Sequence, residues 1–548
     1  MELTGTIPTF RDLFPKFGNV GEKQIIKIIK RLHLRDCLFI LSKLSRHYYK
    51  YCLMRHDVHN KYQTYRSRCF ELIDDETIRA IKERESLNKK EYTVIFPELS
   101  ILHLIKMCLR YCDGPGYTKT ENFPVSVLNN IGRCLLITNS VMEDWQRKGV
   151  PSKSYASEEL LVNFTKQLIA DKNYDVLQKL YQNYFLFNFL KKYKKEFDIE
   201  KIFIDKYKIN VSEYFAFLFL LYSKFLITNA SEEDWEMPHF NLKQALSNLK
   251  SKFKNNLLED LIINKINYQK LDESFFNITD IIKRPLVELD DGAVVPISLK
   301  CLFVGLTDSV YFDILDYLTD AKEKSKFSEY FGKAIEDYFR DIILAIDKKT
   351  TFLTYGKKQN QANDAILVQK GGVIFFECKK RQFHNLEFLR SGNKELFFNR
   401  INEFYFKPLK QICDRIKDFR NGKFSLDGVD KNVLIYPVII CPLAPPIFSG
   451  AWDKFNLNQY VLPDSYKLDK NITHPEFMDF AELECIEEYL RENPKKSFID
   501  LIKTKRGDEK FHNANWMVIL HKNNMDLQNK RLGQEYLEEA ENFKNLLF

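Results

Sequence analysis

The stretch that decides the fold is Asn363-Asp-Ala-Ile-Leu-Val-Gln-Lys-Gly-Gly-Val-Ile-Phe-Phe-Glu-Cys-Lys-Lys380. Two apolar runs flank Gln-Lys-Gly-Gly, a pattern typical of a β-hairpin. With the loop centred between Lys370 and Gly371, Asp364 lies opposite Glu377, and their Cβ atoms are about 5 Å apart. Between these charged ends both faces of both strands are apolar, which predicts strands in the middle of a sheet, covered on both sides.

The paired acidic residues at the end of this hairpin need a physical reason. Two facing carboxylates repel each other unless a cation lies between them. Mg²⁺ is typically held by one or two carboxylates together with water and substrate phosphate. Alternation places Lys379 on the same face as Glu377, where its ammonium group can orient a water beside a phosphodiester. The grouping fits metal-assisted hydrolysis of a phosphate ester. In the alternative interpretation, Asp364 merely begins a strand and Glu377 forms an ion pair at the rim with Lys379 or Lys380.

These residues resemble the motif of the PD-(D/E)XK nuclease superfamily. That motif is an Asp at the start of one strand, then a hairpin, then (Asp/Glu)-x-Lys on the next strand. Asp364 and Glu377-Cys378-Lys379 match it, and Asn363 stands where the family often has Pro.

The resemblance extends to both sides of the hairpin. Phe331–Phe339 is similar to the Gly-x-x-x-Glu segment of the family's first core helix, and Pro408–Ile416 looks like the helix that follows the lysine strand. Val433–Ile440 would be the next core strand. The resemblance therefore covers about Lys326 to Cys441 and implies a restriction-endonuclease-like core.

The resemblance also implies site residues and a cofactor. The catalytic residues that it implies are Asp364, Glu377, Lys379, Glu336 and Gln411. The metal, Mg²⁺ with Mn²⁺ as a substitute, would be held by Asp364, Glu377, Glu336 and the backbone carbonyl of Cys378. Basic residues surround this segment in the sequence, and phosphate contacts dominate nucleic-acid affinity. We therefore expect nucleic acid, with DNA favoured, to contact Lys380, Arg381, Lys410 and Arg415.

Composition gives the broader organisation. The chain has 548 residues, a net charge of +8 and 14% aromatic residues, with only 19 Gly and 17 Pro. Such a chain is not disordered, and its length indicates more than one domain. Helical periodicity prevails up to about Phe276, and strand patterns begin near Arg284-Pro285. We predict a mostly α-helical N-terminal domain, 1–284, for recognition or regulation, and an α/β nuclease domain with a mixed central sheet, 285–548, whose core is 326–441.

Cysteine usage and hydropathy indicate the setting. The 11 cysteines are irregularly spaced and Met1 to Gly21 has no apolar signal segment, so we expect reduced thiols and a cytoplasmic protein. The apolar run Tyr214–Tyr222 is too short to span a bilayer, so it is expected to be a buried helix without a membrane partner. Two further cysteine patterns are disfavoured as zinc sites: Cys52, His56, His59 and Cys69 match no common spacing, and Cys108-x3-Cys112 is interpreted as a core helix face.

Together these features predict a Mg²⁺-dependent endodeoxyribonuclease. A role in microbial anti-phage defence or restriction follows only by analogy, and a second copy of the chain or an activating protein is the expected partner. The alternative function is a catalytically silent nucleic-acid-binding or scaffold protein with a nuclease-like core.

Overall fold

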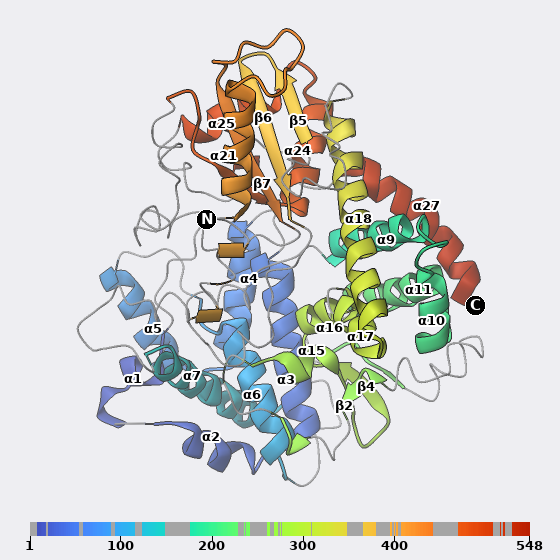
Figure 1. The fold of residues 1–548 in the computed structure, drawn as a ribbon. Coiled ribbons are helices and arrows are strands. Elements are labelled where there is room, and N and C mark those ends of the chain that lie inside the picture. The colour runs from blue at the N-terminus through green and yellow to red at the C-terminus, as the bar shows by residue number, and fades with distance from the viewer. Residues whose placement is uncertain are drawn as a thin grey trace. The chain divides into compact units, whose positions relative to one another are not determined.

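The chain is mostly helical, with two small mixed sheets among the described residues (Figure 1). The computed structural model describes residues 8–17, 20–53, 58–88, 94–114, 123–147, 176–227, 235, 237–241, 260–263, 268–271, 275, 277–307, 310–347, 365–379, 395–396, 399, 402–403, 407–441, 470–507, 516, 519–520 and 529–547. The chain divides into two compact units. The first comprises Met1–Asn183, Glu200–Tyr317 and Glu539–Phe548, and the second comprises Tyr184–Ile199 and Leu318–Glu538.

The first unit is built mainly from helices. They are α1 (Phe10–Leu13), α2 (Glu22–Ile29), α3 (Leu34–His47), α4 (Val58–Glu71), α5 (Asp75–Asn88), α6 (Glu98–Tyr111), α7 (Val125–Arg147), the first half of α9 (Val176–Lys191), α10 (Ile199–Tyr207), α11 (Val211–Tyr222), α15 (Thr279–Lys283), α16 (Leu299–Thr307) and α17 (Val310–Tyr317). The apolar run of α11 is largely buried, as predicted. No helix in the described part of the chain is both long and apolar enough to cross a membrane.

A small sheet of order β1-β4-β3-β2 completes the first unit. Its strands are β1 (Phe240–Asn241), β2 (Ile262–Ile263), β3 (Leu286–Glu288) and β4 (Ala293–Pro296). β3 and β4 are antiparallel, and Gly292 in their turn has a φ of 77°, which costs glycine little. The predicted second domain starts with this hairpin, whereas by contact the hairpin groups with the first unit.

The second unit contains the predicted mixed sheet, of order β5-β6-β7-β8. Its elements are the second half of α9, α18 (Ala321–Ile346), β5 (Ala365–Gln369), β6 (Gly372–Cys378), α21 (Lys407–Arg420), β7 (Ile435–Cys441), β8 (Glu476–Asp479), α24 (Phe480–Glu492), α25 (Phe498–Arg506) and the first half of α27 (Lys530–Leu547). β5 runs antiparallel to β6, whereas β6, β7 and β8 are mutually parallel.

The β5–β6 hairpin has the predicted register. Ile366 pairs with Phe375 and Gln369 pairs with Gly372, so the loop consists of Lys370 and Gly371. Gly371 has a φ of 98°, a left-handed conformation that favours glycine. Gly372 is required for a different reason, because a Cβ atom there would lie 2.6 Å from the carbonyl oxygen of Leu434.

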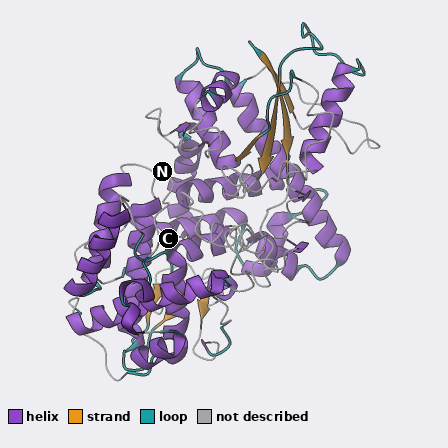
Figure 2. Ribbon diagram, turned by 90° about the vertical axis from the view of Figure 1, so that its left-hand side faces the viewer, coloured by secondary structure: helices purple, strands orange, loops and turns teal. Residues whose placement is uncertain are grey.

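Helices cover both faces of this sheet. Phe375 and Phe376 are neighbours in β6 and therefore point to opposite faces. The Phe375 ring packs on Phe419 of α21, with centroids 6.2 Å apart. The Phe376 ring packs on Phe339 of α18 and Phe498 of α25, both at 5.8 Å. Figure 2 shows these strands edge-on with helices on both sides.

The two strands of the hairpin differ in their burial. Every residue of β6 is buried, as expected for a central strand covered on both sides. β5 lies at the edge of the described sheet and exposes Val368, so the prediction of a central position is not met there. Thr350–Tyr355, a short run whose β-branched and aromatic residues are also typical of a strand, lies outside the described residues.

Candidate active site

The candidate site lies where β6 ends. Glu377 and Cys378 are the last residues of β6, and they pair with Ile439 and Ile440 of the parallel strand β7. The ladder continues for one more bond, because the backbone N–H of Lys379 donates to the carbonyl of Ile440 over 2.7 Å. The sheet therefore fixes the backbone of the whole Glu-x-Lys segment.

The side chains of Glu377 and Lys379 form a short polar chain with α21. Phe375, Glu377 and Lys379 are two residues apart along the strand, so their side chains point to the same face of the sheet, which α21 covers. Lys379 Nζ donates to Glu377 Oε1 over 3.0 Å and to Gln411 Oε1 over 2.7 Å. Glu377 is only 4% exposed, whereas the Lys379 side chain is 21% exposed. The ammonium group thus lies between two oxygen acceptors at the boundary between core and surface.

This geometry bears on the two interpretations of the motif. The alternative interpretation expects an ion pair between Glu377 and Lys379 or Lys380, and the structure has the contact with Lys379. A rim ion pair, however, is normally solvated, whereas Glu377 is buried. Gln411 of α21, the glutamine that the sequence indicated, accepts a second hydrogen bond from Lys379.

Three of the predicted catalytic and nucleic-acid-binding residues lie outside the described residues. They are Asp364, Lys380 and Arg381. The register pairs Ala365 with Phe376, and continuing it by one residue would oppose Asp364 to Glu377. That pairing, and with it the acidic pair, stays a prediction.

Glu336 belongs to the long helix α18. It is half-buried on α18, the helix that covers the Phe376 face rather than the α21 face. Its charge acts on Tyr193, whose pKa is raised to about 12 by burial, by the hydrogen bond that it donates to Asp337 and by nearby acidic groups. A metal-binding role for Glu336 stays a prediction.

The two described basic residues of the predicted nucleic-acid set differ in accessibility. Lys410 is a surface residue of α21; its side chain is 70% exposed and pairs with Asp414 at 3.3 Å. Arg415, one turn later, has a side chain only 7% exposed and pairs with Asp418 at 3.4 Å. Lys410 can therefore reach a phosphate, whereas the burial of Arg415 favours a contact within the protein.

The donor atoms of this site suit a hard cation. Glu377 and Gln411 offer carboxylate and amide oxygens, the ligand type of Mg²⁺, and a carboxylate at position 364 would add another. Among the residues that the structure describes, the only three metal-binding side chains with ligand atoms all within 4.8 Å are Cys37, Cys108 and Cys112. This group lies in the first unit.

The cysteine group extends one prediction and leaves another open. Cys108 is buried on α6, as a core helix face requires, and the structure also places Cys37 of α3 beside Cys108 and Cys112. The spacing of Cys108 and Cys112 was the sequence pattern that could have indicated a metal site. No pattern near Cys37 indicated that it joins them. Of the other disfavoured set, Cys69 is a buried thiol on α4, and the side chains of Cys52, His56 and His59 lie outside the described residues.

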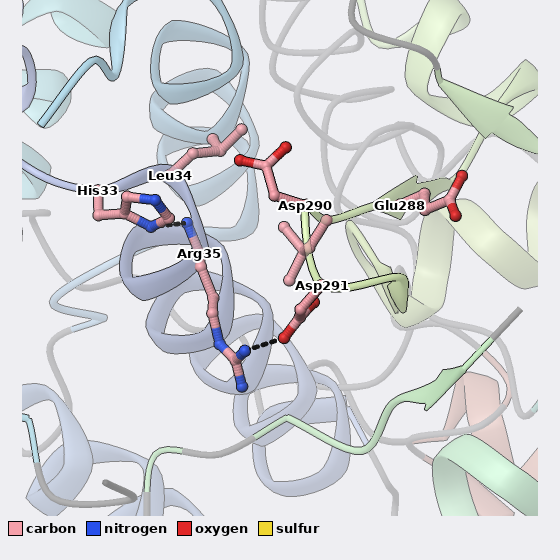
Figure 3. A pocket seen from close by; sticks show the side chains of 7 residues that line it. His33, Leu34, Arg35, Glu288, Asp290 and Asp291 are labelled. Atoms are coloured by element: carbon pink, nitrogen blue, oxygen red, sulfur yellow. Dashed lines mark hydrogen bonds and ion pairs between the residues drawn. The ribbon is translucent and has the colours of Figure 1, made fainter. Parts of the chain in front are cut away.

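The first unit also has a shallow pocket (Figure 3). It is lined by His33, Leu34, Arg35, Glu288, Leu289, Asp290 and Asp291. Arg35 forms an ion pair with Asp291, and the backbone N–H of Arg35 donates to His33 Nδ1 over 3.2 Å. These contacts tie the β3–β4 turn to the start of α3, which is a structural role.

Comparisons with models of protein families, with curated proteins and with solved structures gave no match to this chain.

Proposed function

We propose that the chain is a metal-dependent nuclease of the PD-(D/E)XK type, acting on DNA as an endonuclease. The observation that carries the proposal is the position of the Lys379 ammonium, between the buried carboxylate of Glu377 and the amide oxygen of Gln411. The order of elements also supports it, because the acidic helix α18, the β5–β6 hairpin, α21 and the parallel strand β7 follow one another as that resemblance implies.

The chain's own groups would act mainly by position and charge. Lys379 has its backbone held by β7 and its side chain held by Gln411, so its ammonium group is oriented before substrate arrives. A cation placed in this way can orient the attacking water and stabilise the negative charge that develops on the phosphate oxygens. Mg²⁺, bound by Glu377 and Asp364, would supply Lewis-acid stabilisation of that charge. Lys410 offers an exposed positive charge for the phosphate backbone.

The test is cleavage of supercoiled plasmid, linear duplex, single-stranded DNA and RNA by the purified full chain. We expect cutting of DNA with Mg²⁺ or Mn²⁺ and none with EDTA. Glu377→Gln and Lys379→Ala should each lower the cleavage rate by at least about 10²-fold, as expected for loss of a group that acts in the transition state. The matched control is Lys370→Ala, an exposed lysine at the other end of the same hairpin, which should cut at the wild-type rate.

Two results would decide against the proposal. Cutting that is unaffected by Glu377→Gln and Lys379→Ala would mean that the activity lies elsewhere. Binding of nucleic acid without cleavage under every metal condition would instead favour the silent binding or scaffold protein. DNA end-labelling and a gel-shift assay on the same samples separate these outcomes.

A further inference from the structure

The thiols of Cys37, Cys108 and Cys112 lie close together because hydrogen bonds fix the chain at the start of α3 and at the end of α6. Cys37 is in the first turn of α3, and its N–H donates to the carbonyl of His33 over 3.2 Å. Cys112 caps the C-terminus of α6, and its N–H donates to the carbonyl of Cys108 over 3.0 Å. The end of α6 and the start of α3 therefore each present sulfur from a well-ordered helix turn.

A glycine brings these two helix ends together. The N–H of Gly114 donates to the carbonyl of Leu32 over 3.1 Å. A Cβ atom on Gly114 would lie 2.6 Å from the carbonyl oxygen of Arg31, so only glycine allows this approach. The segment that leaves α6 is thus held against the turn that enters α3, which places Cys112 beside Cys37.

The sulfur positions have the spacing of ligands around one metal ion. Cys37 Sγ and Cys112 Sγ are 3.7 Å apart, and all three Sγ atoms lie within 4.8 Å of one another. Zn–S bonds of about 2.3 Å in a tetrahedral site put two sulfurs about 3.8 Å apart. We propose that Cys37, Cys108 and Cys112 bind a Zn²⁺ ion, which links the C-terminus of α6 to the N-terminus of α3.

The burial of the group agrees with a structural metal site. Cys37 and Cys108 are at most 1% exposed, and Cys112 is partly exposed, so one side of the cluster can accept a fourth ligand. Cysteine binds a metal ion as the thiolate. The fourth ligand at that side would be a water molecule.

Other chemistries for these sulfurs fit less well. A disulfide needs an S–S bond of about 2.05 Å and would leave the third thiol of the group unused. In a [4Fe–4S] cluster each cysteine binds a different iron, which spreads the sulfurs further apart than one ion does. Soft thiolate ligands in tetrahedral geometry are typical of zinc.

The direct test is the metal content of the full chain, purified without chelator and analysed by inductively coupled plasma mass spectrometry. We expect about one zinc per chain in the wild type and loss of most of it in Cys37→Ser, Cys108→Ser and Cys112→Ser. The matched control is Cys301→Ser, a buried cysteine of α16 that is outside the group and should keep its zinc. Stoichiometric iron or copper, or equal zinc in all four variants, would overturn the proposal.

A second measurement does not depend on the variants folding. Titration of wild-type protein with an organomercurial should release zinc, which a colorimetric zinc indicator detects. Co²⁺-exchanged wild type should show the strong near-ultraviolet absorption of thiolate-to-cobalt charge transfer. A protein that stays metal-free after zinc or cobalt is added under reducing conditions, or that carries a Cys37–Cys112 disulfide when isolated with thiols blocked, contradicts the proposal. Because the group lies in the first unit, this result is independent of the nuclease assay.

Discussion

Gln411 accepts a hydrogen bond from Lys379, with 2.7 Å between Oε1 and Nζ. Gln411 belongs to α21 and Lys379 directly follows β6, so this bond joins a helix to the end of a strand. The backbone of Lys379 is bonded to β7 at the same time. The lysine is therefore held by two elements that are separate in the sequence, which is the arrangement expected of a side chain that must be oriented before it acts.

Replacing Gln411 should separate positioning from folding. Gln411→Ala removes an acceptor from a charged donor, which is worth about 1.5 kcal/mol, and should slow DNA cleavage about tenfold. Gln411→Glu keeps an acceptor at this position and should recover much of the rate. The measurement is the single-turnover cleavage rate across pH, with thermal melting recorded for each variant. Equal rates in the Ala variant and the wild type would show that Gln411 does not orient Lys379.

Replacement of glycine by alanine should change stability in opposite directions at Gly372, which begins β6, and at Gly533 in α27. Gly372→Ala places a methyl group 2.6 Å from the carbonyl oxygen of Leu434 and should destabilise the fold by about 1–3 kcal/mol. Gly533→Ala, within α27, meets nothing within 4 Å and should stabilise it by about 1 kcal/mol. Urea unfolding measures both. The same sign of change at the two sites would contradict this interpretation.

A buried ion pair in the second unit should be costly to break. Arg531 donates to both oxygens of Glu487, over 2.6 and 3.0 Å, and also to Asp341 over 2.9 Å. Arg531→Met leaves the Glu487 carboxylate, whose side chain is 2% exposed, without these bonds. The expected loss is about 3–5 kcal/mol in the free energy of unfolding. Lys530→Met, at the exposed neighbouring lysine, is the control and should change it by no more than about 0.5 kcal/mol.

The same variant should also respond to pH. Burial raises the pKa of Glu487, and the hydrogen bonds from Arg531 offset part of this effect. Without Arg531 the pKa should rise further. A carboxyl group whose folded pKa is raised adds stability below its unfolded pKa, and this is lost as pH rises through the folded pKa. Arg531→Met should therefore be less destabilised at pH 4 than at pH 8. An equal loss at both pH values would show that Glu487 does not carry the effect.

The first turn of α25 predicts the opposite pH dependence. Ser497 donates its hydroxyl and its backbone N–H to Asp500, over 2.8 and 2.9 Å, and these bonds lower the pKa of that carboxyl group. The resulting stability is present above the unfolded pKa and is lost as pH falls through the folded pKa. Ser497→Ala should cost about 1 kcal/mol at pH 7 and less at pH 3. Thr504→Ala, on the exposed side of α25, should show no such pH dependence in urea unfolding.

The β5–β6 hairpin could be predicted because the residues that determine it are close together in the sequence. The two-residue loop at Lys370-Gly371 sets the register, and apolar residues on both faces of β6 indicate a covered strand. The helical period of α21 likewise placed Gln411 on a defined face. The parallel strand β7 was identified from its unbroken apolar run, which is typical of strands buried on both sides.

Other features depend on contacts that no local pattern encodes. β8 is only four residues long and has acidic residues at both ends, so its pairing with β7 had no signature in the sequence. β1 and β2 are two-residue strands within a region that reads as helical. Cys37 joins Cys108 only because Gly114 packs on the turn before α3. Each of these depends on tertiary packing rather than on propensity.

The adjacent rings of Phe375 and Phe376 are anchored in different layers, one against α21 and the other against α18 and α25. This two-sided anchoring has an evolutionary consequence. A substitution in one helix layer alters the packing of one ring, while the other ring still keeps the strand in place. Substitutions in α21, the helix beside Glu377, should therefore be tolerated without loss of the strand that carries Glu377.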